Sequence, residues 1–146
     1  MIKISTRGQY ALMTMEVLAD QPDDSYVPMK KISHKQNLSV KYLEQILIQL
    51  SKAGLVEGMR GNNGGYKLKK SPEKYTAGEI LRAMEGDLNP KGTSDCNAVK
   101  TLGNEEFWNG FDNAINSYVD SISLKEILEK SRENSGYMYY IRANAL

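Results

Sequence analysis

Side chains that could hydrogen-bond nucleic-acid bases recur at helical spacing between residues 39 and 52. A Gln amide can form two hydrogen bonds with an adenine edge, a Glu carboxylate can accept one from the amino group of cytosine, and Lys neutralises phosphates. An apolar stripe along the same segment indicates that these polar groups share the solvent-facing side of one helix. An ordinary solvated helix face has the same composition, so this segment alone does not decide between the two interpretations. The candidate residues are Ser39, Lys41, Tyr42, Glu44, Gln45, Gln49 and Lys52.

An arginine beside a glycine-rich stretch is the second candidate site. Arg60 precedes the sequence Gly-Asn-Asn-Gly-Gly. Glycines let a backbone come close to a duplex, and a guanidinium fits the narrow, negative minor groove. A tight turn would need the glycines but not the arginine. No Gly-Lys-Ser/Thr ending follows, which argues against a nucleotide phosphate loop. We expect DNA contacts from Arg60, Asn62, Asn63 and Gly64.

Residues for enzymatic chemistry are scarce. The chain has one histidine, His34, and one cysteine, Cys96, and neither belongs to a pattern of nucleophile and base. The sequence therefore indicates no enzyme. The adjacent Asp95 disfavours a thiolate at Cys96, but a redox-sensing role for this thiol stays open.

Charge is unevenly distributed along the chain. The 146 residues carry a formal net charge of +1, which taken alone argues against a nucleic-acid partner. Residues 1–75, however, hold 12 basic and 7 acidic side chains, whereas residues 76–146 hold 7 and 11. A net of +5 in the first half and −4 in the second predicts a polyanion-binding half beside an acidic one.

Composition and segment lengths favour a globular cytoplasmic protein. Hydrophobic residues make up 40% and charged residues 25% of the chain, as in ordinary globular domains. No apolar run approaches the roughly 18 residues of a membrane helix, and the first residues do not resemble a secretory signal. A single cysteine is also typical of a reducing compartment.

The elements that would position these residues follow from periodicity and capping. Apolar spacing predicts a helix from about residue 5 to before residue 21, a short helix ending near residue 36, and a third helix from Ser39 to Gly54. Two alternating segments, 55–60 and 66–70, flank the glycine-rich stretch and predict a β-hairpin. A helix-turn-helix followed directly by a hairpin is a winged helix.

The second half of the chain has helical signals separated by a long loop. Capping boxes at 76–79 and 123–126 predict helices reaching about Met84 and Arg132, and residues 86–103 show no periodicity. Between them an apolar stripe over about four turns predicts a long helix from about residue 104 to 121. The stripe consists of Phe107, Phe111, Ala114, Ile115, Tyr118 and Ile122.

Five motifs in this order resemble the IscR/NsrR/CymR family of bacterial winged-helix regulators. The motifs are Ser-Thr-Arg-Gly-Gln-Tyr-Ala-Leu at 5–12, Leu-Ser through Tyr-Leu-Glu-Gln at 38–45, Ala-Gly-Leu-Val at 53–56, Arg-Gly through Gly-Gly-Tyr at 60–66, and Thr-Ala-Gly-Glu-Ile at 76–80. The resemblance covers nearly the whole chain. It implies a mainly α fold with a small β-hairpin: a winged helix-turn-helix domain at 1–85, a regulatory loop at 86–103, and a dimerisation helix with a C-terminal helix and tail at 104–146.

The resemblance also implies how the protein works. Members of the family are homodimers whose recognition helices enter successive major grooves of a palindromic double-stranded DNA operator while the wings reach the minor groove. Thr6 joins the DNA-binding residues at the start of the first helix. The stripe residues Phe107, Phe111, Ile115, Tyr118 and Ile122 form the expected dimer interface. Gln9 stands where the family often carries a basic residue.

One departure from the family concerns metal. Cluster-binding members carry three cysteines before the long helix, whereas this chain offers Cys96 alone, so we expect no cofactor and no metal. The Gly-Tyr-Met-Tyr-Tyr-Ile segment at 136–141 is similar to the cysteine-metabolism branch, whose members repress sulfur-assimilation genes and form a complex with cysteine synthase. A thiol- or iron-sulfur-responsive regulator, and a winged helix used only for protein contacts, remain the alternatives.

Overall fold

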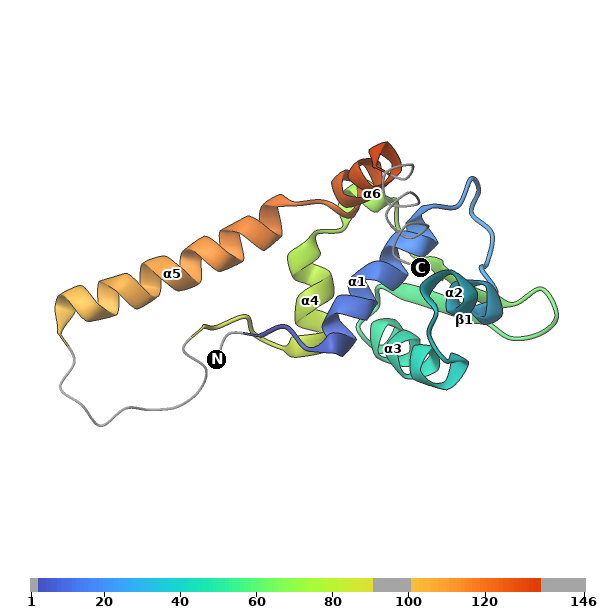
Figure 1. Ribbon diagram of the computed structural model, residues 1–146, viewed down its shortest axis with the longest axis horizontal. Helices are drawn as coiled ribbons and strands as arrows, with labels where there is room; N and C mark the ends of the chain where they lie inside the picture. Colours follow the sequence, from blue (N-terminus) through green and yellow to red (C-terminus); the bar gives the residue numbers. More distant parts are fainter. Residues whose placement is uncertain (1–2, 91–100, 135–146) are drawn as a thin grey trace, which may run out of the picture.

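The computed structural model describes residues 3–90 and 101–134, which form a compact body and one long helix projecting from it (Figure 1). The described part is mostly helical, with one antiparallel two-stranded sheet. In chain order the elements are α1 (Thr6–Ala19), α2 (Met29–Gln36), α3 (Val40–Lys52), β1 (Val56–Met59), β2 (Gly65–Leu68), the 3-10 helix η1 (Pro72–Lys74), α4 (Ala77–Glu85), α5 (Leu102–Ser121) and α6 (Leu124–Glu133).

Helix starts follow the capping residues of the sequence. The hydroxyls of Ser39, Thr76 and Ser123 accept hydrogen bonds from backbone N–H groups in the first turns of α3, α4 and α6. These hydrogen bonds satisfy donors that have no partner inside the helix. The box predicted at Thr76 differs in its second half, because the Glu79 carboxylate accepts from Lys70 Nζ at 3.1 and 3.4 Å. Attraction to this ammonium draws Glu79 away from the cap.

A left-handed residue makes the turn between α2 and α3. Asn37 ends α2 with φ of 53°, a conformation that Asn tolerates better than most residues. The N–H of Leu38 then donates to the Ser33 carbonyl at 3.1 Å. The two helices and the hairpin that follows confirm the predicted winged helix-turn-helix.

The hydrophobic core is built from both ends of the chain. Buried side chains of α1, α3 and α4 meet those of α6, whose Leu124 and Leu128 are buried in the same cluster. Tyr75 lies inside this core, where its hydroxyl donates to the Leu55 carbonyl at 2.6 Å. The core therefore extends beyond the residue 1–85 segment that the sequence predicted as one domain, because α6 returns to pack on α1 (Figure 1).

The hairpin is anchored to the body at its base. β1 and β2 pair with Val56 opposite Leu68 and Met59 opposite Gly65. On the other edge of β2, Val27 and Tyr66 exchange backbone hydrogen bonds of 2.8 and 3.0 Å. Both strands are shorter than the predicted segments. At the base of the hairpin, Leu55 O and the N–H groups of Lys69 and Lys70 bond to the Tyr75 hydroxyl instead of to each other. At the tip, β2 begins at Gly65, one residue earlier than predicted.

α5 projects from the body (Figure 1). None of its 20 residues is buried, and it begins at Leu102, two residues inside the predicted loop. Its inner end is held where Ala77 N donates to Ile122 O at 2.9 Å and Leu124 N donates to Tyr75 O at 3.0 Å. Residues 91–100 of that loop, which include Cys96, and the tail at 135–146 lie outside the described residues. No described helix is long and apolar enough to cross a membrane.

Candidate nucleic-acid interface

α3 has one buried and one exposed stripe. Leu43, Ile46, Leu47 and Leu50 are fully buried, which turns the opposite side of the helix to the solvent. That side carries ammonium, carboxylate and amide groups at spacings of three and four, as the sequence predicts. Its exposed members are Lys41, Glu44, Gln45, Ile48 and Lys52.

Ile48 is the member of this stripe that the sequence reasoning did not identify. Its side chain is 42% exposed between polar neighbours one turn away on either side. Val40, in the first turn of α3, is exposed to a similar extent. The 41-44-45-48-52 spacing was the available signal, since it places Ile48 outside the buried stripe. An aliphatic group here can contact the methyl group of thymine.

The start of α3 is held by its cap and by α1. The Ser39 hydroxyl accepts from the Tyr42 backbone N–H at 3.2 Å, so part of its hydrogen-bonding capacity serves the helix. The half-buried Tyr42 ring meets Tyr10 edge to face at 5.9 Å between centroids. This contact fixes the Tyr42 ring on the surface beside Lys41. Thr6 is exposed in the first turn of α1.

Gln49 does not lie on the open face that the sequence predicted for it. Its side-chain amide donates to the backbone carbonyls of Ala83 at 3.2 Å and Met84 at 3.5 Å, at the end of α4. Its carbonyl oxygen accepts from Arg7 at 3.4 Å. Gln49 lies at the edge of the exposed stripe, and the carbonyls that end α4 need donors. The residue therefore joins α3 to α4.

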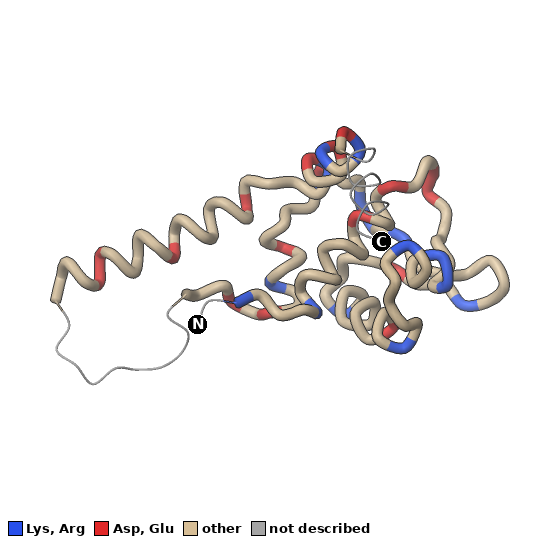
Figure 2. Tube along the Cα trace, in the orientation of Figure 1, with Lys and Arg blue, Asp and Glu red and all other residues tan. Residues whose placement is uncertain are grey.

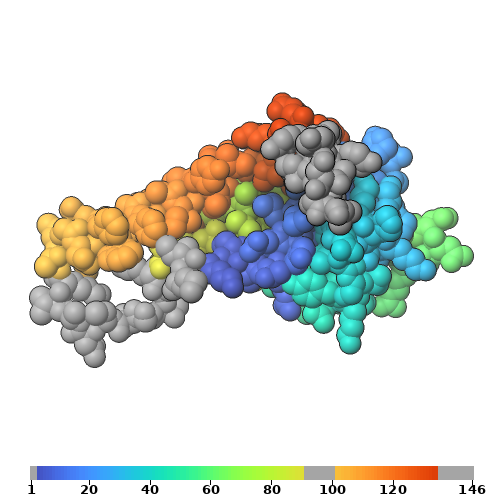
Figure 3. Space-filling model, viewed as in Figure 1, coloured from blue at the N-terminus to red at the C-terminus, as the bar shows by residue number. Residues whose placement is uncertain are grey.

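The wing tip presents its polar residues to the solvent. Arg60, Asn62 and Asn63 are exposed, and Figure 3 shows the tip, in green, projecting beyond the body. Gly64 is buried, and its N–H donates to the Gly61 carbonyl at 3.0 Å. A Cβ at Gly64 would collide with the backbone of Met59. Gly64 therefore shapes the turn that carries Arg60, rather than offering a contact surface itself.

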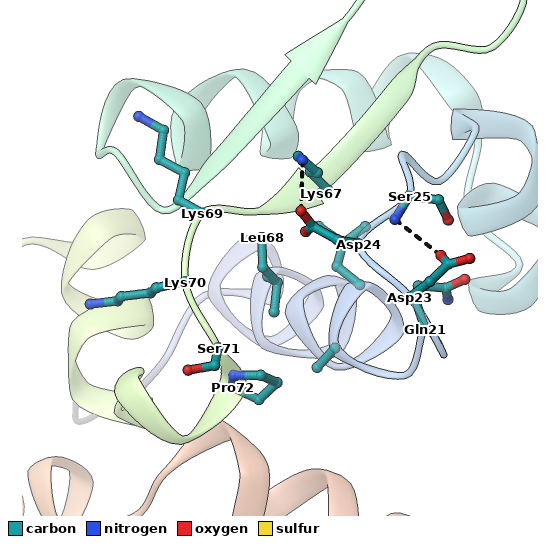
Figure 4. Close-up of a pocket in the computed structure, with 12 residues that line it drawn as sticks. Gln21, Asp23, Asp24, Ser25, Lys67, Leu68, Lys69, Lys70, Ser71 and Pro72 are labelled. Carbon is teal, nitrogen blue, oxygen red and sulfur yellow. Dashed lines mark hydrogen bonds and ion pairs between the residues drawn. The ribbon is translucent and has the colours of Figure 1, made fainter.

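A lysine network holds the base of the wing (Figure 4). Lys67 Nζ lies 3.1 Å from Asp24 Oδ2, 3.5 Å from Glu57 Oε1 and 4.9 Å from the centre of the Tyr26 ring. The hydrogen bond with Asp24 raises the pKa of Lys67. These residues border an open pocket of about 350 Å³ between the end of α1 and β2, and Lys69 and Lys70 extend away from the Lys67–Asp24 pair.

The basic residues of the 25–70 segment fall into two groups, those in ion pairs within the protein and those exposed to the solvent. Lys67 and Lys70 form ion pairs with Asp24 and Glu79, at 3.1 Å each. The other basic side chains of the segment are exposed on α2, on α3 and near the wing, whereas α5 carries acidic residues and no basic ones (Figure 2). The exposed set is Lys30, Lys31, Lys35, Lys41, Lys52, Arg60 and Lys69. The basic and acidic parts of the sequence are therefore also separated in space.

Aromatic and aliphatic side chains form an exposed stripe along α5. Phe107 is 60% exposed and Tyr118 is 68% exposed, while Phe111, Ile115 and Ile122 are partly exposed. Phe107 stacks on Phe111 at 6.1 Å between centroids, and Trp108 meets both rings edge to face. A contiguous apolar surface of this kind on a projecting helix is typical of a protein interface.

Comparisons with known proteins agree with this arrangement. A family model described as "Rrf2: Iron-dependent Transcriptional regulator" matches residues 4–130. The HTH-type transcriptional regulator CymR of Bacillus subtilis is 36% identical over 96% of this chain and all of its own length. The HTH-type transcriptional regulator IscR of Aliivibrio salmonicida is 32% identical over 87% of this chain and 77% of its own.

Solved structures give the same result. The structure of B. subtilis CymR, described as the global cysteine regulator, superposes with a TM-score of 0.79 at 35% identity, covering 89% of this chain and 98% of its own. The T. potens IscR structure has a TM-score of 0.74 at 35% identity and covers 94% of this chain and 96% of its own. The resemblance found in the sequence is confirmed, and so is the expectation of a regulator rather than an enzyme. The chain belongs to the Rrf2 family of transcriptional regulators and has their winged-helix fold.

Proposed function

We propose that the protein is a homodimeric repressor that binds a palindromic operator and controls genes of cysteine and sulfur metabolism. The observation that carries the DNA-binding part is the exposed polar stripe of α3, a helix that contacts β1 of the wing whose tip carries Arg60. The metabolic part is supported by the full-length relative from B. subtilis, whose structure is described as that of a global cysteine regulator. Such a protein works on chromosomal DNA in the cytoplasm.

The DNA-reading residues divide into three groups in this proposal. Lys41, Glu44 and Gln45 read base edges in the major groove, and Ile48 packs on a thymine methyl group. Arg60 enters the minor groove, and Asn62 and Asn63 lie beside it at the tip. Thr6, Ser39 and Tyr42 contact phosphates, which position the helix without reading sequence. Gln49 joins α3 to the end of α4, and Gly64 shapes the wing turn that carries Arg60.

Dimerisation through α5 is the second part of the proposal. The helix has no buried residue within the described chain, and its exposed rings would be covered by the same helix of a second copy. A twofold pairing presents the same surface from both subunits. It also places two recognition helices on one face of the DNA, which matches a palindromic operator.

Iron does not fit the residues of this chain in the way that the family description suggests. A cluster held by three thiolates cannot be assembled from one cysteine per chain. Within residues 3–90 and 101–134, no three His, Cys, Asp or Glu side chains come together as metal ligands. No step of the proposed regulation therefore passes through iron.

Control of the repressor by a partner is the remaining part. Complex formation with cysteine synthase would report cysteine availability, in line with the branch that the sequence resembles. Oxidation of Cys96 is the alternative signal, and a relative from Staphylococcus aureus at 33% identity was solved in an oxidised form. A Cys96→Ser variant separates the two, because DNA binding that still responds to oxidant excludes this thiol as the sensor.

Selection of DNA fragments by the purified full-length protein tests the proposal. We expect a palindromic consensus and binding that weakens steeply with salt. Arg60→Ala should weaken binding by about 1–3 kcal/mol if Arg60 reads the minor groove. Arg132→Ala on α6 removes the same charge far from the wing and is the matched control. Absence of binding to genomic fragments at low salt would instead favour a protein-interaction module.

A further inference from the structure

Arg82 on α4 binds two residues of α5 at once. Its Nη1 donates to Asp120 Oδ1 at 2.6 Å and its Nη2 donates to Asp120 Oδ2 at 3.0 Å, a two-pronged ion pair. The same Nη2 also donates at 2.7 Å to Oδ1 of Asn116, which lies one turn before Asp120 in α5. The hydrogen bonds between Arg82 and Asp120 raise the pKa of Arg82 and lower the pKa of Asp120. One guanidinium thus holds two successive turns of the projecting helix.

The closeness of α4 and α5 at this point depends on a glycine. Gly78 lies one turn before Arg82, and a Cβ there would collide with the Asp120 carboxylate and meet Val119 at 3.0 Å. Asn116 is held from its other side as well, since its amide donates to the Leu88 carbonyl at 3.1 Å. The geometry of the contact is therefore set from both helices.

Two fixed points determine the direction of α5. The backbone hydrogen bonds of Ile122 and Leu124 hold its inner end, and Arg82 holds it again at Asp120 and Asn116. A helix of 20 residues is about 30 Å long. A tilt of roughly 10° about the inner end would therefore move the outer end by roughly 5 Å, more than the rise of one base pair, about 3.4 Å.

We propose that Arg82 is a positioning residue that sets the spacing between the two half-sites of the operator. This inference rests on the proposed dimerisation through α5. In such a dimer, the angle between α5 and the winged-helix body fixes how far each α3 lies from the twofold axis. Half-sites must match that distance, since recognition helices enter grooves about one helical turn apart. Lysine cannot replace this residue, because an ammonium lacks the planar fork that reaches both acceptors.

Operators that differ in half-site spacing test the role in DNA binding. The selected operator is lengthened or shortened by one base pair, and full-length protein is titrated against each version at one salt concentration. We expect the wild type to lose roughly 10-fold or more in affinity on each change, and Arg82→Ala and Arg82→Lys to lose less than about 3-fold. An Arg82→Ala protein that keeps the wild-type spacing profile overturns the proposal.

Arg132→Ala is the matched control, because it also removes an arginine bound to an aspartate, here Asp20 at 2.8 Å, but from α6 and α1. We expect it to keep the wild-type profile. Sedimentation of each variant checks that the dimer persists. A wild-type protein that is monomeric contradicts the proposed function, and with it the spacing role.

A distance measurement inside one protomer tests whether the Arg82 contact with Asp120 and Asn116 holds α5 in place, independently of DNA and of the dimer. Spin labels at the exposed positions Lys30 and Asn109, in a Cys96→Ser background diluted with unlabelled protein, report the direction of α5 relative to the body. We expect the distance distribution to broaden at least about twofold in Arg82→Ala and to stay unchanged in Arg132→Ala. An equally narrow distance distribution in Arg82→Ala would show that Arg82 does not fix the direction of α5, even if DNA affinity has changed.

Discussion

The ammonium of Lys67 lies 3.1 Å from the carboxylate of Asp24, and this ion pair joins the wing to the loop that follows α1. The two residues are 43 positions apart in the chain. Because the Asp24 side chain is largely exposed, solvent screens this pair and it adds little to stability. Its larger effect is geometric, because it adds a side-chain contact to the Val27–Tyr66 backbone bridge at the base of the wing.

Asp24→Asn separates this positioning effect from simple electrostatics. Removal of an acidic charge near DNA should strengthen binding if charge alone matters. If the ion pair positions the wing, the same change should weaken operator binding by roughly 3-fold with little change in melting temperature. Titration of the operator measures the difference. Asp23→Asn removes the same charge from a residue that accepts from Ser25 N within the loop, and it should not weaken binding.

Tyr75→Phe should destabilise the fold. The buried hydroxyl donates to Leu55 O and accepts from Lys69 N at 3.0 Å and Lys70 N at 3.2 Å, and burial raises the pKa of Tyr75. Loss of these hydrogen bonds should lower the free energy of unfolding by about 1–3 kcal/mol in urea titrations. Tyr10→Phe keeps the ring contact with Tyr42 and removes a hydroxyl that makes no hydrogen bond within the described residues, so it should be neutral. Equal effects of the two substitutions would contradict the role of the Tyr75 hydroxyl.

Gln45 and Gln49 should respond differently to the same substitution. Gln45→Ala should weaken operator binding by about 1–3 kcal/mol and leave the melting temperature unchanged, because the side chain is exposed on the reading face. Gln49→Ala should lower the melting temperature, since it removes donors to the end of α4. Operator titration and thermal unfolding of both variants measure the contrast. Identical behaviour would show that the two residues share one role.

Phe107→Ala should weaken the dimer. The ring is 60% exposed, and its ring contacts among the described residues are with Trp108 and Phe111 of the same helix, so truncation should cost little in folding of the protomer. If it lies in the α5 interface, the dimer dissociation constant should rise at least about 10-fold in sedimentation equilibrium. Asn109→Ala, on the opposite side of the helix, is the control. A dimer unaffected by Phe107→Ala would place the interface elsewhere.

The Arg82–Asp120 pair should make stability depend on pH in the acidic range. Hydrogen bonds from Arg82 lower the pKa of Asp120 in the folded state, so the stabilisation is present above the unfolded pKa and is lost as pH falls through the folded one. Asp120→Asn should therefore melt at a lower temperature than the wild type near neutral pH. The difference should shrink below about pH 4. Glu106→Gln, on the exposed face of α5, should show no such trend.

The sequence by itself determined the elements and the chemistry of the reading face. The caps at Ser39, Thr76 and Ser123 bond to residues three positions away, so the local sequence predicts them. The apolar repeat of α3 follows a helical period and is likewise predicted from the local sequence. The glycine-rich tip beside Arg60 is local in the same way. The charge imbalance between the halves was also present in the sequence, and the fold separates it in space (Figure 2).

Only the tertiary structure decided which polar residues are used inside the protein. Gln49 lies one turn from Gln45, yet it bonds to α4, because a helical period defines a face but not the neighbour that packs at its edge. The sequence does not show that Lys67 has a partner, whereas the fold places Asp24 3.1 Å from its ammonium. The packing of α6 into the core and the Arg82–Asp120 contact, 38 residues apart in the chain, depend on how separate elements meet, which no local pattern encodes.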